Sequence, residues 1–148
     1  MPETRMEKEV QQFCDAWQGL NTIYEDYART QEMPYTNLYI LNLLTRLENC
    51  TQKMICERAL LPKQTVNTVI TCFYKSGWVE LRELPEDRRT KSIHLTSSGW
   101  EYANKVILHI RQAELRAMEK LTNEQRASLL NGMRIYCEAF REEMLSGK

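Results

Sequence analysis

Five hydrogen-bonding side chains, four of them uncharged, recur at helical spacing between residues 63 and 75. The polar positions share one side of a predicted helix: Gln64, Asn67, Thr68, Thr71 and Lys75. Solvated helix faces usually carry Glu and Lys, whereas Thr and Asn lower helix propensity. Gln and Asn can pair with adenine through two hydrogen bonds in the major groove, and Thr can contact a thymine methyl. The residue types therefore indicate a base-reading surface, with a merely solvated polar face as the alternative.

The opposite side of the same segment is apolar. Its members recur at i, i+3, i+4 and i+7: Val66, Val69, Ile70 and Phe73. This periodicity predicts an amphipathic helix that packs on a core. Pro62 suits its first turn, because the missing N–H would be unbonded there anyway, and Gly77 suits the left-handed position just past its end.

A second, shorter helix is predicted before this one. Thr51 can cap a helix over Gln52–Ala59, and Leu60 and Leu61 then make a tight turn. Two short helices joined in this way form a helix-turn-helix, in which the second helix reads the DNA.

The segment after Gly77 predicts a β-hairpin. Residues 78–82 and 92–95 alternate apolar and polar side chains, as half-buried strands do. The intervening residues 84–91 form a charged turn with three basic side chains in its last four positions. A protruding basic tip can contact phosphates or enter a narrow minor groove, although a solvated charged turn is the alternative.

Asp87 is expected to structure this turn. An acid at such a position can pair with Arg89 across the hairpin, which leaves Arg88 free for DNA.

Residues 51–99 resemble the multiple-antibiotic-resistance regulator (MarR) family in several motifs. These are the helix 65–73, Gly77-Trp78-Val79, Asp87-Arg88-Arg89 and Leu95-Thr96-Ser97-Ser98-Gly99. Their combination is specific, although each motif alone is weak. Pro62 departs from the family, which commonly has a small hydroxyl residue as the helix cap there.

The resemblance implies a homodimeric winged-helix repressor or activator that binds pseudo-palindromic double-stranded DNA. It also implies release by a small anionic or phenolic ligand or by cysteine oxidation. The expected fold is mainly α with a small β-hairpin wing (α+β), a winged helix-turn-helix with N- and C-terminal dimerisation helices. The chain of 148 residues suits one domain, 1–148.

Apolar stripes at both ends of the chain predict the dimer interface. The first follows steps of three and four: Val10, Phe13, Trp17, Leu20, Tyr24 and Tyr27. Others follow nearer the C-terminus, the last after a capping box of Thr122 and Gln125: Trp100, Ala103, Ile107, Ile110, Ala117 and Leu121, then Leu129, Met133, Tyr136, Phe140 and Met144. We expect residues 1–34 and 100–148 to dimerise around a DNA-binding core, 35–99. The alternative is that these helices fold back within a monomer.

Charge is balanced over the chain but unevenly distributed. The 20 Lys and Arg residues equal the 20 Asp and Glu residues, yet residues 58–91 hold seven basic and four acidic side chains, a net charge of +3. This distribution suits a protein that reads sequence and argues against one that coats DNA. No apolar run of roughly twenty residues and no signal peptide is present, so we expect a cytoplasmic protein without membrane contact.

The candidate DNA-binding residues fall into three groups. The base readers are Gln64, Thr65, Asn67, Thr68 and Thr71, the phosphate contacts are Lys63, Lys75 and Lys91, and the wing supplies Arg88 and Arg89. No phosphate-cradling glycine loop, hydrolase motif or metal-ligand spacing is present, so we expect neither an enzyme nor a metal or other cofactor. The alternative function is a winged-helix adaptor that binds proteins.

Two regulatory sites are expected. In the family, effectors lodge where the dimer helices meet the winged domain, and aromatic side chains could line such a pocket here: Trp17, Tyr24, Tyr39 and Trp100. Aromatic residues at helical spacing are more often core, which is the alternative. Cys14 is a candidate redox site, because peroxide-sensing members of the family keep a reactive cysteine close to this position; only the position supports the comparison. Cys56 and Cys72 are expected on inward faces.

Overall fold

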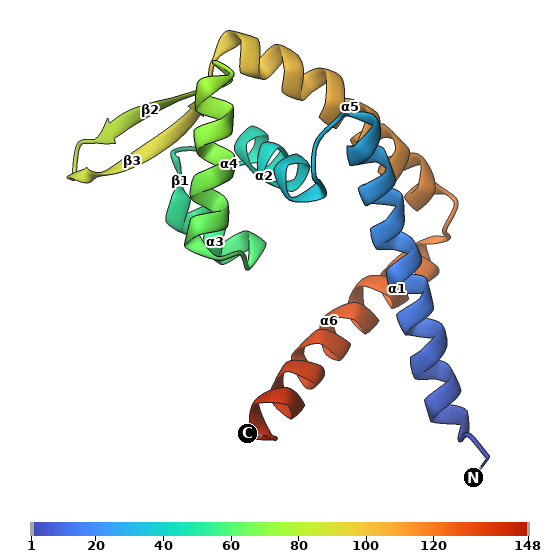
Figure 1. The fold of residues 1–148 in the computed structure, drawn as a ribbon. Coiled ribbons are helices and arrows are strands. Elements are labelled where there is room, and N and C mark those ends of the chain that lie inside the picture. The colour runs from blue at the N-terminus through green and yellow to red at the C-terminus, as the bar shows by residue number, and fades with distance from the viewer. Residues whose placement is uncertain (1, 148) are drawn as a thin grey trace. The chain divides into compact units, whose positions relative to one another are not determined.

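The computed structural model describes residues 2–147 and is mainly helical. Its elements are α1 (Arg5–Thr30), α2 (Tyr35–Arg46), β1 (Cys50–Thr51), α3 (Gln52–Ala59), α4 (Lys63–Lys75), β2 (Val79–Leu84), β3 (Asp87–Leu95), α5 (Ser97–Glu119) and α6 (Asn123–Ser146) (Figure 1). The chain divides into two compact units, with the boundary inside α5 between Val106 and Ile107. The architecture confirms the predicted winged-helix fold class. None of the described helices is long and apolar enough to cross a membrane.

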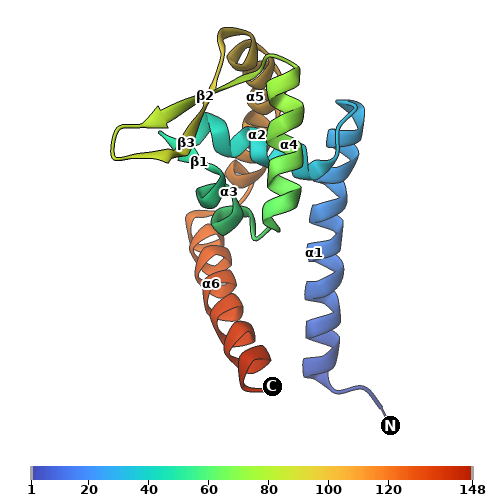
Figure 2. The same ribbon diagram turned by 60° about the vertical axis from the view of Figure 1, so that its left-hand side comes forward.

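The first unit contains a three-stranded antiparallel sheet in the order β1-β3-β2. The pairing of β2 with β3 forms the predicted hairpin, which projects beyond the helices in both views (Figure 1, Figure 2). The strand β1 was not predicted from sequence, because two residues are too few to show alternation. It pairs Cys50 with Ile93 and Thr51 with Ser92, so it joins the start of α3 to the wing sheet.

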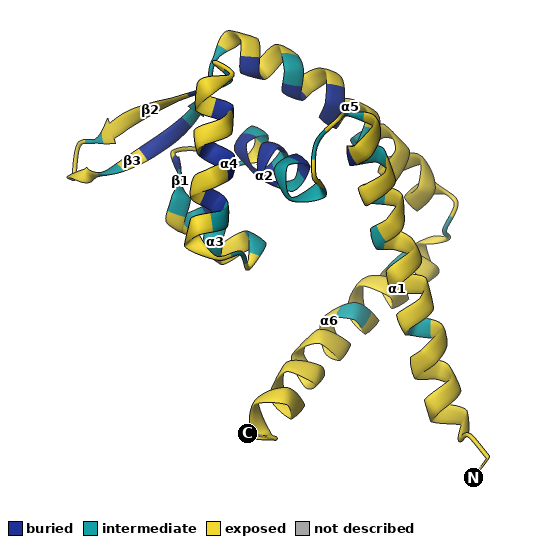
Figure 3. Cartoon of the chain, in the orientation of Figure 1, coloured by how far each residue is buried: buried dark blue, intermediate teal, exposed yellow. Residues whose placement is uncertain are grey.

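The predicted apolar stripe of α4 is confirmed. Val66, Val69, Ile70 and Phe73 are all buried, and Phe73 is 1% exposed. They belong to a core to which α2 contributes a nearly continuous buried run that ends at Leu44. Figure 3 shows buried residues on α2, on one side of α4, on β3 and on α5. Burial of one face therefore leaves the polar face of α4 outward.

The helix ends follow local chemistry. The Thr51 hydroxyl oxygen accepts a hydrogen bond from the backbone N–H of Met54 at 3.2 Å, as the predicted cap requires. Pro62 stands just before α4 as its N-cap and supplies no side-chain cap. Gly77 adopts φ 74°, the left-handed conformation predicted for it, and Leu60 adopts φ 53° in the turn between α3 and α4.

A cluster of hydrogen bonds fastens the end of the wing to α5. The hydroxyls of Thr96 and Ser98 donate to the carbonyl oxygen of Gly77 at 2.6 Å and 3.0 Å. The N–H of Gly99 donates to the Thr96 hydroxyl at 3.1 Å, and the N–H of Thr96 donates to the carbonyl oxygen of Trp78 at 2.9 Å. The Leu-Thr-x-x-Gly motif therefore has a structural role: it joins the start of α5 to the segment that precedes β2.

The helix α1 exposes much of its predicted stripe. Trp17 and Leu20 are 47% and 46% exposed, whereas Ala28 near the helix end is fully buried. The hydroxyl of Tyr27 donates to the carbonyl oxygen of Val106 at 2.8 Å, which ties this end of α1 to α5. Part of the apolar stripe of α1 is therefore exposed to solvent.

The second unit contains α6, which begins at the predicted capping box. The N–H of Gln125 donates to the Thr122 hydroxyl at 3.1 Å, and the side-chain oxygen of Gln125 accepts from the N–H of Thr122 at 2.9 Å. Tyr136 and Phe140 stack with their ring centroids 5.8 Å apart and are both exposed. The role of residues 1–34 and 100–148 as dimerisation helices stays a prediction.

Candidate nucleic-acid interface

The polar face predicted on α4 is open to solvent. Its exposed members are Lys63, Gln64, Asn67, Thr68, Thr71 and Lys75. Thr65 differs, because it is half-buried next to the core residue Val66. Six of the seven predicted side chains on this helix are therefore accessible to duplex DNA.

Two residues of this face are held by hydrogen bonds. The Thr68 hydroxyl donates to the backbone carbonyl oxygen of Gln64 at 2.9 Å, so its hydrogen is engaged and its methyl group remains for an apolar contact. The side-chain oxygen of Asn67 accepts from Nε2 of Gln52 at 3.4 Å. Gln52 was absent from the sequence-based candidates because it belongs to α3, and a contact between helices leaves no periodic signal.

The wing hairpin is longer and its turn tighter than predicted. Cross-strand pairing continues to Leu84 and Asp87, so Pro85 and Glu86 close the hairpin, with an irregularity in register between Glu83 and Leu84. The prediction of a turn over 84–91 was wrong because exposed two-stranded ribbons carry polar side chains on both faces and do not alternate. The predicted wing cations are all exposed on β3: Arg88, Arg89 and Lys91.

Asp87 structures the turn, but through different partners than predicted. One carboxylate oxygen accepts from the backbone N–H of Arg89 at 2.9 Å, and the other accepts from the Thr90 hydroxyl at 2.9 Å. The backbone bond from Arg89, and then the Thr90 bond, hold the pKa of Asp87 below its usual value. The expected side-chain pair with Arg89 is corrected to a backbone contact, which leaves the Arg89 guanidinium available.

Cations of the wing differ in their partners. Arg82 on β2 pairs with the carboxylate of Glu80. Within residues 2–147, Arg88, Arg89 and Lys91 form no such ion pair. The hairpin end also carries the acids Glu83, Glu86 and Asp87, but the charged groups of these three cations are not held in ion pairs and can contact phosphates.

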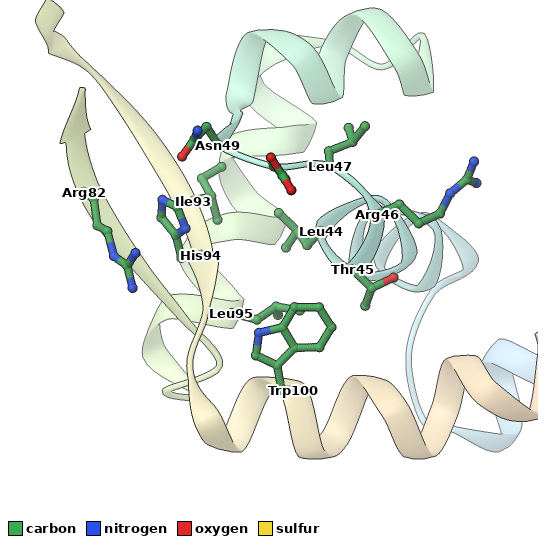
Figure 4. A pocket seen from close by; sticks show the side chains of 11 residues that line it. Leu44, Thr45, Arg46, Leu47, Asn49, Arg82, Ile93, His94, Leu95 and Trp100 are labelled. Atoms are coloured by element: carbon green, nitrogen blue, oxygen red, sulfur yellow. The ribbon is translucent and has the colours of Figure 1, made fainter. Parts of the chain in front are cut away.

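A cavity of about 560 Å³ lies under the wing, between the end of α2, β3 and the start of α5. Leu44, Ile93 and Leu95 give it apolar walls, while Figure 4 shows His94 and the Trp100 indole directed toward it. Burial, and then the charge of Arg82, lower the pKa of His94, so its imidazole is kept neutral. Ser92 and His94 share a hydrogen bond of 2.7 Å.

The aromatic residues predicted for an effector pocket are not gathered in this cavity. Trp100 lines it, whereas Trp17, Tyr24 and Tyr39 do not. Tyr24 and Tyr39 each contact Tyr35, with ring centroids 5.6 Å and 6.2 Å apart. Tyr35 therefore links these two rings where α1 and α2 pack together, apart from Trp100.

The cysteines also differ from expectation. Cys72 is exposed and Cys56 is half-buried, so the predicted inward position of Cys72 was wrong. Cys72 follows Thr68 by four residues and shares its side of α4. Burial raises the pKa of the Cys50 thiol to about 11, which keeps it protonated. Cys14 is exposed on α1.

Comparison with known proteins agrees with this geometry. Residues 31–90, which include α2, the helix-turn-helix and most of the wing, match the model of the MarR family. The chain is 29% identical over 92 residues to the uncharacterized HTH-type transcriptional regulator YwhA of Bacillus subtilis (strain 168). That alignment covers 62% of this chain and 66% of the length of YwhA. The relative is named as a regulator, in agreement with the expectation that the chain is not an enzyme.

Solved structures share the fold over nearly the whole chain. NMB1585, a MarR family regulator from Neisseria meningitidis, superposes with a TM-score of 0.81 at 22% identity and covers 95% of this chain and 99% of its own. FabT of Streptococcus pneumoniae, solved in complex with DNA, gives a TM-score of 0.75 at 14% identity, with coverage of 93% and 98%. The chain is therefore similar to the MarR family in its match over residues 31–90 and in the fold that it shares with these regulators.

Proposed function

We propose that the protein is a transcription factor, acting as a repressor, that binds a pseudo-palindromic operator as a homodimer. The observation that carries the proposal is the two-sided character of α4. One side is buried core, and the other exposes hydrogen-bonding side chains beside a hairpin whose cations Arg88, Arg89 and Lys91 are exposed. Amides and hydroxyls can distinguish base pairs, whereas the wing cations attract any phosphate backbone.

The proposed contacts follow this division. The base readers are Gln64, Thr65, Asn67, Thr68 and Thr71; Lys63, Lys75 and Lys91 contact phosphates; and Arg88 and Arg89 act from the wing, with Asp87 holding its turn. FabT, whose fold this chain shares, was solved with DNA, which supports placing the same elements against a duplex. A two-fold dimer presents two copies of α4, so half-sites are expected about one helical turn, or a multiple of it, apart.

Release of the operator is proposed to follow binding of a small anionic or phenolic effector. The cavity of about 560 Å³ beside Trp100 supports this, because ligand sites of 300–1,000 Å³ are typical. Its charged lining residues are Arg46, Glu48 and Arg82, of which Arg82 pairs with Glu80. A ligand there would contact both β3, which carries the wing, and the loop that leads to α3.

A selection on random duplex DNA at near-physiological salt tests the DNA-reading function. The wild type is expected to enrich a pseudo-palindrome. Asn67→Ala should lose about 1–3 kcal/mol of discrimination at one symmetric base pair, because it removes a carboxamide that reads a base edge. Asn104→Ala, an exposed Asn on α5, is the matched control and should select the wild-type sequence.

No enrichment by the wild type, or binding that disappears with added salt, would contradict sequence-specific recognition. The protein-binding adaptor would then be the better proposal. An adaptor predicts that Asn67→Ala changes affinity for a protein partner and leaves DNA binding at its nonspecific level.

Oxidation of Cys14 is the weaker candidate for the releasing signal. We expect mild peroxide to leave operator affinity unchanged within about twofold, since no cationic partner that would favour a thiolate is evident beside Cys14 in the sequence. Gel-shift titration of the wild type and Cys14→Ser, with mass spectrometry of Cys14, tests this. Loss of binding in oxidised wild type that Cys14→Ser prevents would establish the redox signal, and Cys72→Ser separates any effect at α4.

A further inference from the structure

One hydrogen bond joins the two helices of the helix-turn-helix at the exposed face. Nε2 of Gln52, the first residue of α3, donates to Oδ1 of Asn67 on α4 across 3.4 Å. Gln52 is half-buried and Asn67 is exposed. We infer that Gln52 is a positioning residue, which sets the direction in which Asn67 presents its carboxamide to a base pair. The inference rests on the proposed DNA-reading function.

The backbone around Gln52 is fixed from two sides. Its neighbour Thr51 pairs with Ser92 in the sheet that carries the wing. The Thr51 hydroxyl also caps α3 by accepting from the N–H of Met54 at 3.2 Å. Gln52 therefore extends from a point that is tied both to its own helix and to the wing sheet. A side chain that extends from such a fixed backbone can orient a more mobile partner.

The chemistry of the carboxamide makes its direction matter. Asn has an acceptor oxygen with two lone pairs on one side and an NH₂ with two donors on the other. The donor from Gln52 occupies one lone pair of Asn67 and turns this oxygen toward α3. The NH₂ group and the second lone pair remain for a base edge. Adenine needs a donor and an acceptor side by side, so a rotated amide would present them in the wrong order.

Thr68, the residue next to Asn67, is also held by a hydrogen bond, because its hydroxyl donates to the Gln64 carbonyl oxygen. Two adjacent side chains of the face are therefore ordered before DNA arrives. Ordering in advance reduces the side-chain entropy that is lost on binding. The effect should be confined to the base pair that these residues contact.

The test compares Gln52→Ala and Gln52→Glu with Asn67→Ala and with the double variant Gln52→Ala/Asn67→Ala. Glu has the length of Gln, but its carboxylate cannot donate to the Asn67 oxygen at neutral pH. Equilibrium binding is measured on operator duplexes that carry each of the four base pairs at the symmetric position identified by Asn67→Ala. Thermal unfolding of each variant reports on the fold.

Both Gln52 variants should lose about 3- to 10-fold in discrimination at that position, the range expected for one hydrogen bond. Discrimination at other operator positions should stay unchanged. In the Asn67→Ala background, Gln52→Ala should cause no further loss there, because the two side chains act as one unit. Thermal unfolding temperatures should match that of the wild type, since Gln52 is half-buried at a helix end.

Three results would overturn the inference while leaving the proposed function intact. These are wild-type discrimination in both Gln52 variants, additive losses in the double variant, or an equal loss of affinity on all four duplexes, which would indicate a phosphate contact by Gln52 itself. A wild type without any sequence preference would instead overturn the proposed function, and this inference with it.

Discussion

Gly99→Ala is expected to destabilise the protein by about 3 kcal/mol, because the new methyl group has no space. An ideal Cβ on Gly99 would lie 2.0 Å from the carbonyl oxygen of Trp78. That carbonyl cannot move away freely, since it accepts from the N–H of Thr96 at 2.9 Å. Relief of the collision would separate the end of the wing from α5. The midpoint of thermal unfolding should fall by about 6–12 °C at fixed protein concentration.

Gly19→Ala is the matched control for this substitution. Gly19 lies inside α1, and an added Cβ there would meet no atom within 4 Å. Replacing an unhindered helical glycine should stabilise the protein by about 0.5–1 kcal/mol, since Ala restricts the unfolded chain. Opposite shifts of the two variants would therefore identify steric collision as the cause. An unchanged midpoint in Gly99→Ala would mean that the Trp78–Gly99 approach is looser than the structure has it.

Elements with strong local signals were predictable from sequence. The stripe from Val66 to Phe73 has helical period, and a core must lie on one side of it. Gly77 could be placed because a helix end often needs a left-handed residue. The capping box of Thr122 and Gln125 is likewise a local chemical pattern. In each case the residues that determine the structure are neighbours in the chain.

Features that depend on contacts between elements were not predictable. The strand β1 exists because Cys50 and Thr51 pair with β3, and a segment of two residues has no pattern that predicts a strand. The contact between Gln52 and Asn67 spans fifteen positions and two helices. Cys72 shows the opposite error, because the usual burial of cysteine was given more weight than its helical spacing from Thr68. Residue type is a weaker guide than position when the two disagree.

The remaining large effect concerns the exposed stripe of α1. We expect Trp17→Glu/Leu20→Glu to be monomeric in light scattering at micromolar concentration, since carboxylates in an apolar interface lose their hydration without gaining a partner. Affinity for the full operator should fall by about 10²- to 10⁴-fold, because each half-site would then be bound independently. Affinity for an isolated half-site should not change, since α4 and the wing are untouched. Both measurements are needed to separate lost dimerisation from lost folding.

Gln18→Glu supplies a control, because it adds a carboxylate to α1 at an exposed polar position between these residues. It should remain dimeric and bind the operator as the wild type does. A monomeric wild type would refute the dimer. The alternative, in which the end helices fold back within a monomer, would then have to explain why Trp17 and Leu20 are nearly half exposed. A double variant that stays dimeric would place the interface away from α1. The full reduction in operator affinity with an unchanged half-site affinity would tie recognition by α4 to the pairing of two copies through α1.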